Sequence, residues 1–93
     1  MEHTCHISFQ LIPLTEANKT YSTIELALDI IKKSGLKHIT GPMETTLEGN
    51  YNEIMEVIYR AQQVTLDASG EVVSIIKVHL RKDGKVSFEE KGI

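Results

Sequence analysis

The period of the apolar residues in this chain switches from that of a strand to that of a helix, and does so twice. Residues 4–14 begin the pattern, with apolar side chains at every second position: Cys5, Ile7, Phe9 and Leu11. Alternation of this kind is typical of a strand that buries one face. Pro13 lacks a backbone N–H, which predicts the end of regular strand pairing.

A helical period follows the first strand. Its apolar stripe falls at i, i+3, i+4 and i+7, on Ile24, Ala27, Leu28 and Ile31. Ser22 and Glu25 have the spacing of a capping box at the start of this helix, and Gly35 predicts its end. Two short strands are then predicted at 37–40 and 44–48, joined by a turn at Gly41 and Pro42.

The second half of the chain repeats the order of strand and helix. Asn50 is predicted to cap a second helix that ends near Gly70, with a buried stripe on Ile54, Val57, Ile58 and Ala61. The last long strand is predicted at 72–81. Asp83 and Gly84 then form a strong turn signal, after which residues 85–89 could return as a short fifth strand.

The resulting order, β-α-β-β-α-β, sets the fold class. Two β-α-β halves joined by right-handed crossovers predict an α+β, ferredoxin-like sandwich. Its four-stranded antiparallel sheet would carry both helices on one face. Residues 1–93 are expected to form a single domain, because the length suits one core and no linker or repeat interrupts the pattern.

Composition excludes several classes of protein. With 41% hydrophobic and 25% charged residues the chain is globular, and its net charge of -3 without a basic cluster argues against nucleic acid as a partner. No apolar run approaches the roughly 20 residues that span a bilayer, and the first residues do not resemble a signal peptide. The lone cysteine, Cys5, fits a reducing compartment. We therefore expect a soluble, cytoplasmic protein without a membrane partner.

The face of the sheet that the helices leave uncovered is the candidate functional surface. Its predicted polar residues are His6, Ser8, Gln10, Glu44, Thr46, Glu48, Lys77, His79 and Arg81, with apolar positions at Ile12, Val73 and Ile75. Antiparallel sheets commonly leave one face solvated. The short uncharged side chains of the two central strands favour a ligand pocket instead, and the apolar positions favour packing against another subunit. All three interpretations stay open from the residues alone.

Metal binding and catalysis receive little support. Cys5 and His6 are adjacent in a strand, so their side chains point to opposite faces and cannot chelate one ion. The chain lacks a C-x-x-C motif, which argues against a heavy-metal chaperone of this fold. Neither a metal site nor a cofactor is expected. Glu44 and Glu48 share one face of the third strand, but neither has a clear acid–base partner, so no catalytic residue is predicted.

Three segments together resemble a known family. They are S-F-Q-L-I-P-L at residues 8–14, the stretch P-M-x-T-x-x-E-G at residues 42–49, and Y-N-E-I-M-E-V at residues 51–57. On these segments the chain is similar to the small thiamine-binding-protein family, which is related to YkoF-like domains. The resemblance covers about residues 4–81, and the stretch at residues 42–49 is its most specific part.

The resemblance implies both a ligand and an assembly. Members of the family are ferredoxin-like domains that pair through their sheets into dimers and tetramers. Several bind thiamine or its hydroxymethylpyrimidine portion and catalyse nothing on it. The family often has glycine where this chain has Glu44, so a carboxylate at this position would narrow the pocket or alter its preference.

The chemistry of an aminopyrimidine fits the predicted face. Its ring nitrogen can be protonated, its exocyclic amine is a donor, and its ring has a flat face. A carboxylate together with amide or hydroxyl groups would satisfy the edge of the ring, and Met43 would cover its face. The predicted ligand-binding residues are Ser8, Gln10, Met43, Glu44, Thr46 and Glu48.

The sequence thus predicts a non-enzymatic cytoplasmic protein that binds thiamine or hydroxymethylpyrimidine and forms a homo-oligomer. The dimer or tetramer would form through the sheet face or a sheet edge, since exposed edges and apolar spots need cover. The alternative is a structural or regulatory module that uses the face for self-association alone and binds no small molecule.

Overall fold

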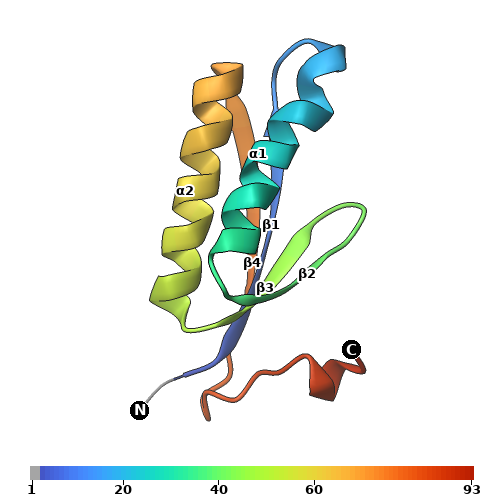
Figure 1. Cartoon of the computed structure of the whole chain (residues 1–93). Helices are drawn as coiled ribbons and strands as arrows, with labels where there is room; N and C mark the ends of the chain where they lie inside the picture. Colours follow the sequence, from blue (N-terminus) through green and yellow to red (C-terminus); the bar gives the residue numbers. More distant parts are fainter. Residues whose placement is uncertain (1–2) are drawn as a thin grey trace.

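Four strands and two long helices form two layers in the computed structural model, which describes residues 3–93 (Figure 1). The strands are β1 (Cys5–Pro13), β2 (Lys37–Thr40), β3 (Thr45–Gly49) and β4 (Val72–His79), and the helices are α1 (Thr20–Lys33) and α2 (Tyr51–Ser69). All neighbouring strands are antiparallel, in the order β2-β3-β1-β4. The predicted ferredoxin-like fold is confirmed, with β1 and β3 as its central strands.

The neighbours of β1 differ in length. β4 pairs with β1 from His6 to Pro13, whereas β3 pairs with it only from Cys5 to Phe9. Beyond Phe9 the edge of β1 that faces β3 therefore has no strand partner within residues 3–93. This difference in length opens the space in which the candidate site lies.

The main core lies between the sheet and the helices, which both cover the same face (Figure 1). Every second residue of β1 enters this core, as the alternation predicts, and α2 contributes its predicted apolar stripe. The side chains with no exposed surface at all include Ile7, Leu47, Ile54 and Ile58.

The two helices begin in different ways. Asn50 caps α2 as predicted, because its side-chain oxygen accepts hydrogen bonds from the backbone N–H groups of Asn52 and Glu53. The capping box predicted at Ser22 is wrong. A short 3₁₀ helix, η1 (Ala17–Lys19), leads directly into α1, so Ser22 lies within the first turn and its hydroxyl donates to the carbonyl oxygen of Lys19.

The predicted fifth strand does not form. The turn at Asp83 and Gly84 is present, and Gly84 adopts a φ of 72°, a left-handed conformation that glycine tolerates. Residue 85 then makes a single parallel bridge with Thr4, through hydrogen bonds that also involve Gly84 and Val86. After the bridge the chain continues into a second 3₁₀ helix, η2 (Glu89–Lys91).

Residues 80–93, which we call the C-terminal segment, leave the end of β4 and run past one end of the sheet (Figure 1). Their apolar side chains Val86 and Phe88 are buried outside the main core cluster. The ring of Phe88 lies 4.4 Å from that of His6, centroid to centroid, on the face opposite the helices.

The expectation of a wholly uncovered face is therefore wrong at this end, where Phe88 leaves His6 only 3% exposed. At the other end of the same face, Ile12, Val73 and Ile75 remain exposed.

Candidate functional site

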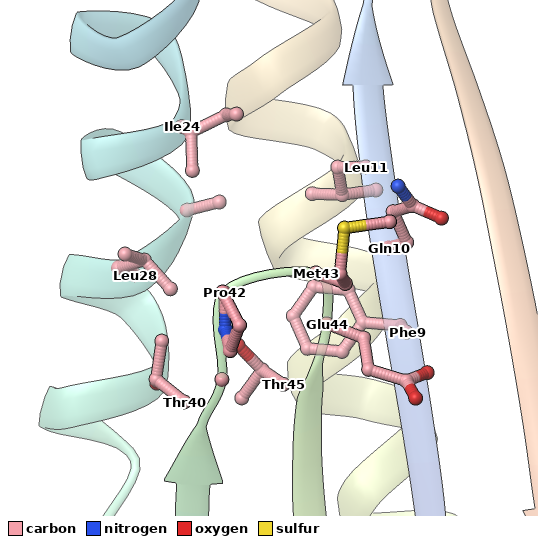
Figure 2. Close-up of a pocket in the computed structure, with 12 residues that line it drawn as sticks. Phe9, Gln10, Leu11, Ile24, Leu28, Thr40, Pro42, Met43, Glu44 and Thr45 are labelled. Atoms are coloured by element: carbon pink, nitrogen blue, oxygen red, sulfur yellow. The ribbon is translucent and has the colours of Figure 1, made fainter.

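A pocket of about 200 Å³ lies at the edge of β1 that β3 does not reach (Figure 2). Three segments enclose it: α1, β1, and the loop that joins β2 to β3. The turn of helix from Ile24 to Leu28 forms one wall, and Phe9 to Leu11 of β1 form the facing wall. The loop from Thr40 to Thr45 closes the third side.

The loop holds Met43 and Glu44 at its tip. The backbone N–H of Gly41 donates to the carbonyl oxygen of Glu44 at 2.9 Å and closes the loop on itself. A Cβ atom at Gly41 would lie 3.3 Å from that same oxygen, so the tight closure favours glycine at this position. Figure 2 shows the Met43 side chain beside Gln10, with the carboxylate of Glu44 directed toward β1.

Apolar surface dominates the lining, which also includes a few polar groups. Ile24, Leu28 and Leu11 supply aliphatic walls, while the ring of Phe9 and the thioether of Met43 supply flat and polarisable surface. The carboxamide of Gln10, the carboxylate of Glu44 and two threonine hydroxyls are the polar groups. Pockets built this way bind small organic molecules and use the polar groups to orient them.

The carboxylate of Glu44 is held by a lysine from the far side of β1. Lys77 on β4 donates from Nζ to Glu44 Oε1 at 2.9 Å. The Lys77 ammonium, and after it the hydroxyl of Ser8, lower the pKa of Glu44 below its ordinary value. Glu44 is therefore ionised at neutral pH.

Glu48 lies at the other end of the same sheet face and has internal partners. Its Oε1 accepts from the backbone N–H of Phe88 at 2.6 Å and contacts His6 Nε2 at 3.0 Å. Lys91 Nζ lies 2.7 Å from His6 Nδ1. Because an ammonium only donates, Nδ1 accepts and the proton of a neutral imidazole resides on Nε2, where it donates to Glu48. We call His6, Glu48, Phe88 and Lys91 the C-terminal anchor.

Burial and hydrogen bonding have opposite effects on the pKa of Glu48. Burial raises the pKa of its carboxyl group, but the hydrogen bonds from His6 and Phe88 and the nearby charge of Lys37 outweigh burial. The pKa of Glu48 is therefore lowered, and the carboxylate stays charged while it holds the C-terminal segment.

The structure separates the six predicted site residues into three groups. Gln10, Met43 and Glu44 line the pocket together. Ser8 lies beside the Glu44 carboxylate, and Thr46 lies directly across from Ser8 in the register of β1 and β3. Glu48 belongs to the C-terminal anchor and is not part of the pocket lining.

Sequence reasoning missed the residues on the helix side of the pocket. Phe9, Leu11, Ile24 and Leu28 have the periodicity of core residues, and their apolar pattern alone places them in the core. One signal could have identified them. The predicted third strand is much shorter than the first, which leaves residues 10–13 without cover from that strand.

Metal ligands do not gather anywhere in the part of the chain that the structure describes. Cys5 and His6 point to opposite faces, as predicted: Cys5 lies in the main core, where burial raises the pKa of its thiol, and His6 lies in the C-terminal anchor. Among residues 3–93 no helix is both long and apolar enough to cross a membrane.

Solved structures share this fold at high similarity. A domain of unknown function from Bacillus cereus, DUF77, superposes with a TM-score of 0.90 at 36% identity, covering 98% of this chain and 88% of that one. A Thermotoga maritima protein, whose description proposes a role in thiamine biosynthesis or salvage, superposes with a TM-score of 0.87 at 25% identity, covering 95% and 94%.

Sequence relatives lead to the same group. A UPF0045 protein of Clostridium perfringens is 34% identical over 89 residues, which cover 95% of this chain and 93% of the relative. A UPF0045 protein of Methanocaldococcus jannaschii is 33% identical over 81 residues, covering 87% and 81%. The family model described as thiamine-binding protein matches residues 7–92. This chain belongs to the thiamine-binding protein family.

Proposed function

We propose that this protein binds thiamine or its hydroxymethylpyrimidine portion in the pocket between α1, β1 and the loop from Thr40 to Thr45, and releases it unchanged. Membership of the thiamine-binding protein family supports the choice of ligand. The observation that carries the choice of site is a small apolar pocket whose lining holds one carboxamide and one ionised carboxylate.

The size of the pocket favours the pyrimidine half of thiamine. Drug-sized ligands occupy pockets of about 300–1,000 Å³, and this pocket measures about 200 Å³. A single substituted ring matches that volume better than two linked rings. In this arrangement the pyrimidine enters the pocket, and the thiazolium ring of thiamine stays at the mouth.

The lining offers a partner for each part of an aminopyrimidine. The carboxamide of Gln10 can donate and accept along the edge of the ring, and the Glu44 carboxylate can accept from the exocyclic amine or a protonated ring nitrogen. Met43 and Phe9 can cover the ring faces. Ser8 supports Glu44 through its hydroxyl, Thr46 lies across from Ser8 in the sheet, and Glu48 holds the C-terminal segment.

The state of the carboxylate supports binding rather than catalysis. A general acid needs a proton to give at the working pH, and the lowered pKa of Glu44 leaves it without one at neutral pH. A permanently charged carboxylate suits the recognition of a cationic or hydrogen-bond-donating ligand. The family description likewise names a binding protein.

We also propose that the protein is a cytoplasmic homo-oligomer without a nucleic-acid or membrane partner. The negative net charge argues against a nucleic-acid partner, and the lone Cys5 fits a reducing compartment. The exposed side chains of Ile12, Val73 and Ile75, at 37%, 46% and 47%, supply apolar surface for a dimer or tetramer.

Calorimetric titration with thiamine and, separately, with hydroxymethylpyrimidine tests the function. We expect both compounds to bind. Gln10→Leu should weaken binding about tenfold or more, since it leaves polar groups of the ligand unpaired in the pocket. The matched control is Gln63→Leu, because Gln63 is exposed on α2 away from the lining. Absence of heat and of a thermal shift with both compounds at millimolar concentration would refute the proposal.

Self-association without a ligand is the second candidate function. The observation that favours it is the exposed apolar group on the sheet face, Ile12, Val73 and Ile75, which lies outside the pocket lining. Sedimentation of the ligand-free protein separates the two candidates when it is combined with the titrations. A stable oligomer that binds neither compound would favour the second.

A further inference from the structure

An ion pair crosses the centre of the sheet face at the mouth of the pocket. Glu44 comes from the loop between β2 and β3, and Lys77 comes from β4, with β1 between them in the sheet. Lys77 lies directly across from Ser8 in the register of β1 and β4. Ser8 on β1 is only 8% exposed, and its hydroxyl faces the carboxylate of Glu44.

Glu44 takes part in both the ion pair and the pocket lining. Of the residues that line the pocket within 3–93, it is the one that carries a formal charge. Lys77 is not part of the lining and reaches Glu44 from outside. The charge that a bound ligand would meet is therefore already neutralised by a side chain of the protein itself.

The ion pair between Lys77 and Glu44 can separate at small cost. The Lys77 side chain is 68% exposed and that of Glu44 35%, so both remain solvated when they separate. Ion pairs of this kind contribute little to stability, and an ammonium on a flexible stem swings into solvent at small cost. A ligand cation at the mouth of the pocket would place its positive charge beside the same carboxylate, and the mainly apolar lining strengthens the interaction between the two charges.

We propose that Glu44 makes the pocket selective for cationic ligands and that Lys77 is an internal competitor which such a ligand displaces. This inference rests on the proposed function and specifies the charge of its ligand. A neutral ligand would leave the pair intact, and its exocyclic amine would donate to the Glu44 carboxylate alongside Lys77. A cation would exchange one partner of Glu44 for another, and its affinity would be reduced by the cost of that exchange.

The test compares four proteins with two ligands of different charge. Thiamine supplies a permanent cation, and hydroxymethylpyrimidine at about pH 8 supplies an uncharged ring. Lys77→Gln should raise the affinity for thiamine about two- to fivefold, the worth of a surface ion pair, and leave the affinity for hydroxymethylpyrimidine unchanged. Glu44→Gln should lower the affinity for thiamine about tenfold.

The decisive measurement is the double variant. In the Glu44→Gln background, Lys77→Gln should no longer change the affinity for thiamine, because the competitor has lost its partner. The matched control is Lys33→Gln, which removes one charge and one exposed ion pair with Asp29 at a site outside the pocket lining. Lys77→Arg keeps the pairing and should bind thiamine like the unmodified protein.

The outcomes separate this inference from the proposed function. One outcome is that thiamine binds while Lys77→Gln changes its affinity no more than Lys33→Gln does. That result would refute competition by Lys77 and leave the proposed function standing. An equal gain for both ligands also refutes it, because the effect would not depend on ligand charge. If neither compound binds to any of the proteins, both the function and the inference fail.

Discussion

Ile58 shows how much a single side chain contributes to this small core. It has no exposed surface and belongs to the cluster that joins α2 to β1. Ile58→Ala removes buried methyl groups and leaves a cavity, so we expect the free energy of unfolding to fall by about 2–5 kcal/mol. Its neighbour Tyr59 is 55% exposed, and Tyr59→Ala should change stability by no more than about 0.5 kcal/mol. Urea denaturation of both variants measures this, and similar losses at the two positions would contradict the assigned burial.

The site residues show which parts of the pocket could be predicted from the sequence. Gln10, Met43 and Glu44 were predicted from their place on one sheet face and from the resemblance, and the structure brings them into one pocket. Glu48 was predicted beside them because it shares their face. Its partners, Phe88 and Lys91, come from a part of the chain whose path local patterns do not determine.

At the scale of elements, the C-terminal segment responds to pH. Arg81, and after it the backbone N–H of Ser87, lower the pKa of Glu90 from an ordinary 4.5 to about 2. A carboxyl group whose pKa is lowered by folding stabilises the fold above its unfolded pKa, and this contribution disappears as the pH falls through the folded value. We therefore expect the C-terminal segment to loosen between about pH 4.5 and 2.

The NMR signals of the Phe88 ring report this loosening, because the ring lies against His6 in the folded segment. The lowered pKa of Glu48 acts in the same direction, since its carboxylate holds the Phe88 N–H. Glu90→Gln should loosen the segment already at neutral pH. Glu89→Gln is the control, since Glu89 is its neighbour in η2 and takes no part in the ion pair between Arg81 and Glu90. Phe88 signals that stay unchanged down to pH 2 would contradict the assigned role of Glu90.

Most of the helices and strands could be predicted from the sequence, but the C-terminal segment could not. Four strands and two helices follow from periodicity and turn signals. β1, β3 and both helices have buried residues at regular spacing, whereas β2 and β4 have none that are fully buried and are recognised by alternation and by the turns beside them. The apolar side chains that the C-terminal segment buries are Val86 and Phe88. Their alternation is compatible with a strand, and it is equally compatible with an irregular segment that packs over the end of the sheet. The start of α1 was misplaced because η1 extends the helical path before the predicted cap.

For the whole molecule, the exposed apolar positions predict an assembly. Ile12, Val73 and Ile75 lie on the half of the sheet face that the C-terminal segment leaves open. We expect sedimentation velocity to show a dimer or tetramer, and Ile75→Glu to shift it toward monomer, because burying an unpaired charge is costly. Leu26→Glu on α1, where the side chain is 44% exposed, is the control and should leave the assembly unchanged. A monomer at micromolar concentration before any substitution would contradict the prediction.

The pairing of β1 with β4 also has a consequence for how the chain reaches its fold. β1 is the first of the strands to be synthesised and β4 the last, yet they are neighbours along most of their length. A growing chain therefore carries β1 with an unpaired edge until β4 emerges. Contacts between such distant segments slow folding, and open strand edges favour aggregation meanwhile. Shortened products that end before Val72 should accordingly be recognised as unfolded and degraded.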